Sequence, residues 1–298
     1  MLDFRRILCP VDFSNASRHA VDHAVTLGEW YDAQITVLHV VPTMVLTPPI
    51  LFAERPSTTV SRETNRRELG DQVREWLSPA LKSGLHPDVV IDEGNPAERI
   101  LAHAVLLQAN LIVMGTHGRG GFERLIMGSV AEKVLRKATC PVMTVPPPAV
   151  ATSRLPFTHL LCPVDFSPSS QAALQIALSI AQEANARLTL LHVFEWPSDE
   201  ASARRVLEMS DYHRQWEAET RQQLAALIPD DVRNWCTPES KLGFGKAYQQ
   251  ILGLAATDQV DLIVMGVRGR SPLDMTFFGS TTNHVVRSAS CPVLTLRG

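Results

Sequence analysis

Short apolar runs alternate with longer stretches whose apolar residues recur at helical spacing, and this alternation continues along the whole chain. Short apolar runs bounded by turn residues are typical of strands that are buried on both faces. In the first half they predict strands at Arg5–Cys9, Gln34–Val41, Asp88–Asp92, Leu111–Gly115 and Val142–Val145. The stretches between them predict helices from Ser14 or Asn15, from Val60 to Leu81, from Pro96 to about Gln108, and from Gly128 to Lys137.

The second half repeats both this pattern and many of the residues. LeuCysProValAspPheSer occurs at 8–14 and 161–167, and LeuIleValMetGly occurs at 111–115 and 262–266. A repeat of this length indicates two complete domains rather than the small units of a solenoid. We expect domains at 1–146 and 155–298, with a proline-rich linker at 147–154. In the second domain, strands are expected near Leu160, Leu188, Trp235, Leu262 and Val293.

Strands that alternate with helices pair in parallel through right-handed crossovers, and their helices then cover both faces of the sheet. Each half is therefore expected to be a doubly wound α/β domain. Sheets of this kind bind ligands at the carboxyl ends of their strands. Two segments that follow a second strand, 42–57 and 195–204, are long and polar or rich in proline, and we interpret them as flaps over such a site.

The loop after the fourth strand has the same glycine spacing in both halves. The pattern G-x2-G-x9-G-[ST] occurs at Gly115–Ser129 and again at Gly266–Ser280. Glycines let backbone amides approach an anion, and the helix that begins at Gly128 presents unpaired N–H groups with partial positive charge. The loop therefore predicts a phosphate site, with glycines that merely turn the chain as the alternative. The spacing is neither that of a Walker loop nor that of a dinucleotide fingerprint.

Polar residues at the ends of the first two strands of each half are further candidates. Asp12 and Asp165 follow the first strands, where a carboxylate either accepts from a ribose hydroxyl or an amine, helps to hold Mg²⁺, or caps the next helix. His39 and His192 end the second strands, and for them a strand-end hydrogen bond is preferred over a ligand role.

Composition and charge limit the classes of function. The chain has 298 residues, 45% of them hydrophobic, and a formal net charge of −3 with a pI near 6.4, which disfavours nucleic acid as a partner. No apolar run is long enough to span a membrane and no secretory signal is evident, so a cytoplasmic location is expected.

The cysteines and two histidines of the first helix are further candidates for chemical sites. The five cysteines lack metal or redox spacing, and we interpret them as buried thiols, with a redox sensor at Cys9 or Cys162 as the alternative. His19 and His23 lie one helical turn apart, which suits a solvated helix face better than a metal site.

These motifs together resemble the universal stress protein family in its tandem form. ProValAspPheSer after the first strand, LeuHisVal ending the second, the glycine loop, and CysProVal before the fifth strand carry the resemblance, which covers both halves. It implies a five-stranded parallel sheet of order 3-2-1-4-5 in each half, and ATP binding, as in many members. By position, the implied ATP residues of the first half are Pro10, Val11, Asp12, Val40, Met114, Gly115, His117, Gly118, Arg119, Gly128, Ser129 and Val130.

The second half keeps a similar set but departs from it inside the loop. Its corresponding residues are Asp165, Val193, Met265, Gly266, Arg268, Gly269, Gly279, Ser280 and Thr281. There GlyArgGlyGly at 118–121 is replaced by GlyArgSerPro at 269–272, and Asp274 adds negative charge, so the first half is the better candidate for ATP, with or without Mg²⁺.

The resemblance also suggests an assembly and a role. Family members typically dimerise through their fifth strands, so the two halves are expected to form such a pair within one chain, with a homodimer still possible. The leading hypothesis is an ATP-binding sensor or switch in stress response that acts on an unknown protein partner. One alternative is an interaction scaffold without nucleotide, which the altered loop of the second half suggests. The other is an ATPase, which should be slow because no residue is marked as a general base for hydrolysis.

Overall fold

Strands and helices follow one another in the same order in both halves of the computed structural model. The first half contains β1 (Arg6–Val11), α1 (Asn15–Tyr31), β2 (Gln34–Val41), α2 (Thr59–Leu77), β3 (Asp88–Glu93), α3 (Pro96–Leu106), β4 (Leu111–Gly115), α4 (Ser129–Lys137) and β5 (Val142–Val145). The second half contains β6 (His159–Pro163), α5 (Pro168–Ala184), β7 (Arg187–Phe194), α7 (Ser210–Ala226), a 3-10 helix (Asp230–Asn234), β8 (Pro238–Phe244), α8 (Ala247–Thr257), β9 (Leu262–Gly266), α9 (Ser280–Ser288) and β10 (Val293–Leu296).

The structure describes residues 4–43, 59–78, 81, 86–117, 127–147, 149, 157–195, 210–234, 236, 238–267 and 279–297. Four of the predicted site residues lie outside these ranges, namely Gly118, Arg119, Arg268 and Gly269. Most of the two segments interpreted as flaps also lies outside the described residues.

Two strands differ most from the sequence prediction. Strand β1 continues through Pro10 to Val11, whereas the expected strand ended at Cys9. The third strand of the second half, β8, begins at Pro238, whereas the expected strand was near Trp235, which the structure does not describe. Strand β8 is only partly buried and its sequence ProGluSerLysLeuGlyPhe contains no apolar run, so the hydrophobic pattern does not mark it.

All ten strands form one sheet, in the order β3-β2-β1-β4-β5-β10-β9-β6-β7-β8. Within each half the paired strands are parallel and in the predicted order, while β5 and β10 pair antiparallel at the centre. At this seam the buried Thr144 hydroxyl donates to the Val293 carbonyl at 3.2 Å, and the buried Thr295 hydroxyl donates to the Val142 carbonyl at 3.0 Å. The two bonds are related by an approximate two-fold axis, so the halves pair within the chain through their fifth strands.

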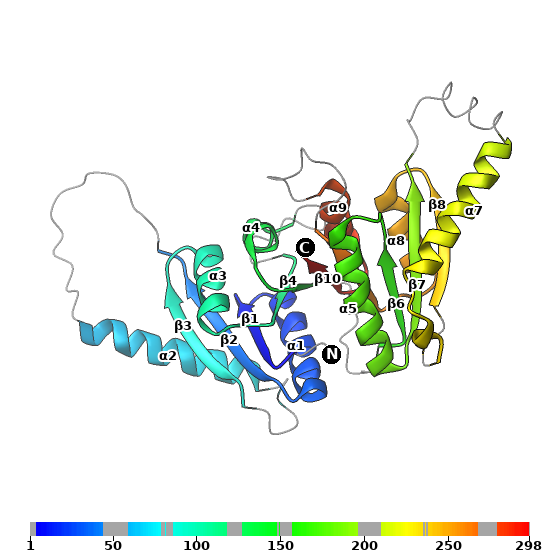
Figure 1. Cartoon of the computed structure of the whole chain (residues 1–298). Helices are drawn as coiled ribbons and strands as arrows, with labels where there is room; N and C mark the ends of the chain where they lie inside the picture. The colour runs from blue at the N-terminus through cyan, green and yellow to red at the C-terminus, as the bar shows by residue number, and fades with distance from the viewer. Residues whose placement is uncertain are drawn as a thin grey trace, which may run out of the picture.

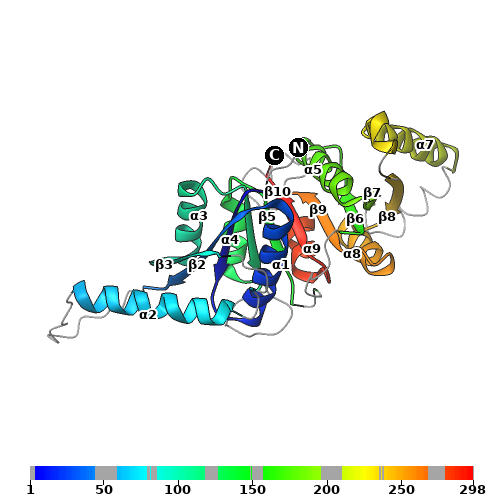
Figure 2. The ribbon, with the colours of Figure 1, turned by 90° about the horizontal axis from the view of Figure 1, so that it is seen from below.

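Helices cover both faces of this sheet, and each face has a core that runs through both halves. Residues of α1, α2, α5 and α7 contribute to one core, and residues of α3, α4, α8 and α9 contribute to the other. Helices α2 and α7 extend outward at opposite ends of the molecule, next to the outer strands (Figures 1 and 2). Each half is therefore doubly wound, as predicted.

Helix α1 shows how local sequence sets the element bounds. The hydroxyl of its N-cap residue, Ser14, accepts from the Ser17 amide, and Asp32 ends the helix in the left-handed conformation at φ 49°. Ser167 and Asn185 occupy the same positions around α5. The inner face of α1 is buried, with Ala20 and Ala24 at most 1% exposed.

Candidate functional site

The first feature of the candidate site is a split between two neighbouring strands. Strand β1 pairs with β2 along its whole length, up to Val11 and His39, but it pairs with β4 only at Ile7 and Leu8. Strands β6 and β9 likewise pair only at Leu160 and Leu161. The carboxyl ends of β1 and β4 therefore lose their ladder at the place where the order of strands reverses, which is where open α/β sheets bind ligands.

A proline in each first strand accounts for the split. Successive amides of a strand point to opposite edges, and the Val164 amide donates to Leu191 on the β7 side. The nitrogen of Pro163 therefore faces β9, and the repeat places Pro10 in the same orientation toward β4. Because proline has no N–H to donate, the ladder ends there. The sequence prediction assigned Pro10 to ligand contact and missed this structural role.

The chain then turns through a strained residue in both halves. Phe13 has φ 63° and Phe166 has φ 62°, a left-handed conformation that costs a bulky residue roughly 1–2 kcal/mol. The Asp12 carboxylate accepts from the Ser14 amide at 3.0 Å and from its hydroxyl at 2.6 Å, which holds this turn. Asp12 therefore supports the start of α1, as one of the sequence alternatives expected, although the direct N-cap is Ser14.

Gly115 and Gly266 serve close packing rather than a left-handed turn. A Cβ on Gly115 would lie 2.8 Å from the carbonyl carbon of Ala16, and a Cβ on Gly266 would lie 2.7 Å from that of Ser169. Real Cβ atoms do not approach so closely, so only glycine lets the end of β4 or β9 rest on the first turn of the helix. The glycines thus bring the loop after β4 next to the turn after β1.

Helix α4 begins at this place without a side-chain cap. Its N-cap is Gly128, whose amide donates to the Thr116 carbonyl at 2.9 Å and whose carbonyl accepts from the Glu132 amide. Ser129 is exposed and Val130 half-buried. The Gly128 amide therefore already has a main-chain acceptor. The amides of the first turn, from Ser129 onward, are the ones suited to bind an anion.

His117 lies between the end of β4 and this helix. Its Nδ1 is 2.8 Å from the Thr116 hydroxyl, and its buried Nε2 has no partner among the described residues. Burial lowers the pKa of His117, and the positive charge of Arg287 lowers this pKa further. The imidazole is therefore neutral at pH 7, and one ring nitrogen remains for a ligand.

His39 and His192 form the strand-end hydrogen bonds that the sequence suggested. The Nδ1–H of His39 donates to the Val11 carbonyl at 2.8 Å, and the Nδ1–H of His192 donates to the Val164 carbonyl at 2.7 Å. The ring of Phe13 also lies 4.8 Å from that of His39. Both histidines therefore hold the turn after the first strand.

The remaining described candidates lie toward the carboxyl ends of the strands of their own half. Val40 is 8% exposed and pairs with Asp92 of β3, and Met114 and Met265 are buried near the ends of β4 and β9. In the second half, Asp165 holds Ser167 as Asp12 holds Ser14, and Gly279 is the N-cap of α9. That half also contains Thr282, whose hydroxyl donates to the Gly266 carbonyl at 3.1 Å.

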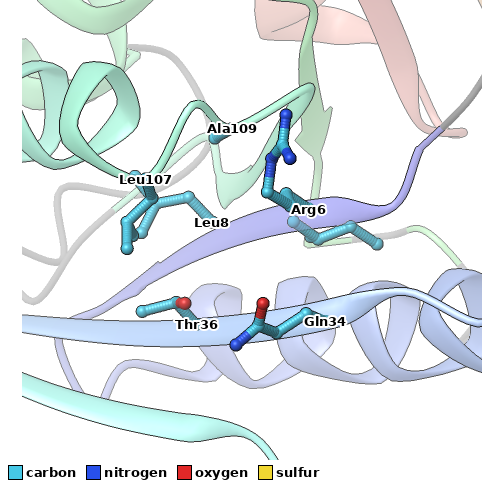
Figure 3. A pocket seen from close by; sticks show the side chains of 7 residues that line it. Arg6, Leu8, Gln34, Thr36, Leu107 and Ala109 are labelled. Carbon is cyan, nitrogen blue, oxygen red and sulfur yellow. The ribbon is translucent and has the colours of Figure 1, made fainter.

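A small cavity lies at the opposite, amino-terminal edge of the first half (Figure 3). It measures about 20 Å³, which is room for about one water molecule and far too little for a nucleotide. The side chains around it include Arg6, Gln34, Thr36 and Leu107.

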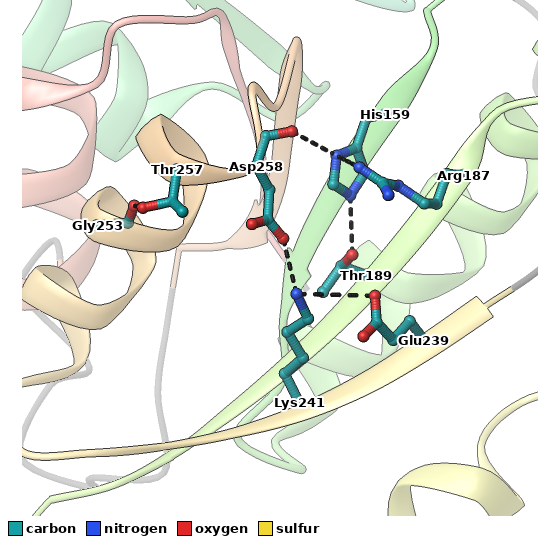
Figure 4. Close-up of polar contacts among 8 residues, drawn as sticks. All are labelled: His159, Arg187, Thr189, Glu239, Lys241, Gly253, Thr257 and Asp258. Carbon is teal, nitrogen blue, oxygen red and sulfur yellow. Dashed lines mark hydrogen bonds and ion pairs between the residues drawn. The ribbon is translucent and has the colours of Figure 1, made fainter.

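In the second half, charged residues and a buried histidine occupy the equivalent place (Figure 4). The Nε2 of His159 lies 2.8 Å from the Thr189 hydroxyl, and its Nδ1 lies 2.8 Å from the Arg187 guanidinium. Lys241 donates to the Asp258 carboxylate at 2.7 Å. The cluster joins residues around β6, β7 and β8, which are separated from β1 and β4 by the central strands of the sheet, so it is distinct from the candidate site of the first half.

The structure also bears on the cysteine and histidine alternatives. Cys9 and Cys162 are fully buried and unpaired, and burial raises the pKa of the Cys9 thiol to about 12. The interpretation as buried thiols is confirmed for these two residues. The expectation of a solvated helix face is wrong for His23, which is 1% exposed and donates from Nδ1 to the His19 carbonyl.

No group of three or more histidine, cysteine or acidic side chains suits a metal ion within the ranges that the structure describes. No helix in these ranges is long and apolar enough to cross a membrane.

Comparison with known proteins gives a consistent result. The model of the universal stress protein family matches residues 3–146 and 156–297. A universal stress protein of Methanocaldococcus jannaschii is 32% identical over 145 residues, which are 49% of this chain and 84% of that protein. One of Mycolicibacterium smegmatis is 28% identical over 301 residues, covering 98% of this chain and 96% of that protein.

A solved structure supports the same conclusion at the level of the fold. The crystal structure of a universal stress protein from Archaeoglobus fulgidus matches with a TM-score of 0.70 at 21% identity, covering 99% of this chain and 98% of that one. The chain therefore belongs to the universal stress protein family and contains the family's domain twice.

Proposed function

We propose that the N-terminal half binds ATP and that the protein acts as an ATP-dependent switch on a protein partner in the stress response, in the cytoplasm. The observation that supports this most is the start of α4, where glycine provides the N-cap and Ser129 is exposed. By contrast, side chains of Ser14, Asn95 and Ser167 cap α1, α3 and α5. A helix start that lacks such a cap, next to a split in the sheet, suits a phosphate group.

The residues around the split suit the other parts of the nucleotide. Pro10 and Val11 end β1 and would line the base and ribose, and the Asp12 carboxylate would accept from a ribose hydroxyl or help to hold Mg²⁺. Val40 would contact the adenine through its backbone. His117 would donate to a phosphate oxygen from Nε2, because that atom is buried and has no partner among the described residues.

The second half is proposed to bind ATP more weakly or not at all. Its helix α9 also begins at an uncapped glycine, but the preceding loop contains Ser271, Pro272 and Asp274. Proline removes one amide donor, and the added carboxylate repels phosphate. The two halves thus have the same uncapped glycine at the start of the helix and differ in the residues of the preceding loop.

Variants at the N-cap of α4 test the proposal by competition for the same amides. Gly128→Asp places a carboxylate where the phosphate would bind, and aspartate is a favourable N-cap at this extended backbone conformation of φ −59° and ψ 137°. Gly128→Asp should keep the fold and weaken ATP binding at least about tenfold by calorimetry. Gly128→Ala controls for the added Cβ alone, and Gly279→Asp makes the same change in the second half.

We expect both control variants to keep ATP affinity close to that of the unmodified protein. Equal ATP affinity in the unmodified protein and in Gly128→Asp would refute the assignment of the phosphate site to α4. Absence of ATP binding by the unmodified protein would favour the scaffold alternative.

A further inference from the structure

The seam between the halves places the end of α9 at the carboxyl edge of the first half. Because β5 and β10 run antiparallel, the carboxyl ends of the strands in one half share an edge with the amino ends of the strands in the other. Helix α9 leads from β9 to β10, so it starts at the carboxyl edge of its own half and ends at the opposite edge. Its last turn, which contains Arg287, therefore lies at the edge where α4 begins.

Three observations indicate that Arg287 lies beside the candidate phosphate site itself. Helices α4 and α9 pack on the same face of the sheet, on either side of the seam. The positive charge of Arg287 lowers the pKa of His117, which lies near the start of the glycine loop in the first half. Gly115 of β4 pairs with Val145 of β5, and the neighbouring Thr144 pairs with Val293 at the start of β10, directly after α9.

The two-fold axis gives Arg287 a counterpart, Arg136, in a different charge environment. Arg136 lies in the last turn of α4 and pairs with Glu132 one helical turn earlier, at 3.4 Å. In α9 the position that corresponds to Glu132 is Asn283. Arg136 and Arg287 therefore occupy equivalent positions in the two halves, and Arg136 is the matched control for Arg287.

We propose that Arg287 of the second half binds the terminal phosphates of the nucleotide held by the first half. This inference rests on the proposed ATP site at α4 and adds a residue from the other domain to it. An arginine donates several N–H groups to phosphate oxygens, so its contribution should grow with the number of phosphates on the ligand. The nucleotide would then link the two domains across the seam, and ATP and AMP would be distinguished by this contact.

Calorimetry on the full chain tests the inference with three ligands, ATP, AMP and adenosine. Arg287→Gln removes the charge, Arg287→Lys keeps the charge but changes the geometry, and Arg136→Gln is the matched control from the equivalent position of α4. We expect Arg287→Gln to weaken ATP binding roughly tenfold to a hundredfold, with adenosine affinity unchanged. Arg287→Lys should recover part of the loss, and Arg136→Gln should leave ATP affinity unchanged. Thermal unfolding without nucleotide checks that each variant is folded.

Three other outcomes would contradict the inference, and they distinguish failure of the Arg287 contact from failure of the proposed ATP site. If the unmodified protein binds ATP and Arg287→Gln binds it equally well, the cross-domain contact is refuted while the proposed function stands. If Arg136→Gln weakens ATP binding as much as Arg287→Gln does, the effect is general electrostatics and the specific contact is refuted. If the unmodified protein binds no ATP, the proposed function and this inference fail together.

Discussion

Gly115 at the end of β4 lies so close to Ala16 in the first turn of α1 that a Cβ would come within 2.8 Å of the Ala16 carbonyl carbon. The same relationship links Gly266 to Ser169 in the second half, at 2.7 Å. This contact joins the loop after the fourth strand to the turn after the first strand, the two segments that form the candidate site. The geometry of the site thus depends on the absence of a side chain.

Gly115→Ala should destabilise the protein by about 1–3 kcal/mol, because the backbone of α1 must shift to admit the methyl group. Gly253→Ala is the matched control, since Gly253 lies inside α8 and its Cβ would meet nothing within 4 Å. Alanine should stabilise that helix by roughly 0.5–1 kcal/mol. Chemical denaturation measures both changes, and equal effects of the two substitutions would contradict the packing role of Gly115.

Much of the fold could be predicted because apolar periodicity and the internal repeat agree. The strands at Leu111–Gly115 and Val142–Val145 have the predicted bounds, since both are buried runs between turn residues. Strand β8 was misplaced because its partly buried sequence shows no apolar run, whereas the other outer strand, β3, has one and begins at the predicted Asp88. Sequence periodicity therefore located a strand only where its residues form such a run.

The candidate site was predictable in outline but not in the roles of its residues. The glycine spacing identified the loop, yet Gly115 serves a contact with Ala16, a residue distant in sequence. Pro10 ends the ladder between β1 and β4 because its nitrogen faces β4. The local sequence does not show which neighbouring strand that nitrogen faces. No local pattern links Arg287 to the first half, because its charge acts on His117 only through the antiparallel pairing of β5 and β10.

Asp92 should make stability depend on pH in the acid range. The Arg99 guanidinium, 2.6 Å from its carboxylate, and His103, at 2.8 Å, hold the pKa of the buried Asp92 well below its usual range. A carboxyl whose pKa is lowered in the folded state contributes stability above its unfolded pKa of about 3.9 and loses it as the pH falls further.

Asp92→Asn should therefore lower the free energy of unfolding by about 1–3 kcal/mol at pH 7, with a smaller difference at pH 3. Asp71→Asn is the control, because the side chain of Asp71 is 76% exposed in its pair with Arg74. A gap between the unmodified protein and Asp92→Asn that stays constant from pH 7 to pH 3 would contradict this account.

The hydroxyls of Thr144 and Thr295 should stabilise the seam between the halves. Each is buried and donates to a carbonyl of the opposite strand, so Thr144→Val and Thr295→Val should each cost about 1 kcal/mol. Thr257→Val removes a comparable bond from the exposed surface of α8 and should cost less. Urea titrations of the three variants compare the costs, and an equal cost at all three positions would contradict a special role of the seam.

The cysteines should be unreactive in the folded protein. Burial raises the pKa of Cys9 and of Cys291 to about 12 and that of Cys140 to about 11, and it also raises the pKa of Cys162 and Cys236. A thiol-specific disulfide reagent at pH 8 should therefore react slowly with native protein, and all five thiols should react after unfolding. Fast stoichiometric reaction of Cys9 or Cys162 in the native state would revive the redox-sensor alternative.

A crystal structure with a non-hydrolysable ATP analogue tests the central claim most directly. The account predicts phosphate oxygens within hydrogen-bond distance of the amides of Ser129 and Val130 at the start of α4, with the base beside Val40. A complex that holds the analogue elsewhere, or a crystal grown at saturating analogue with none bound at the start of α4, would contradict it.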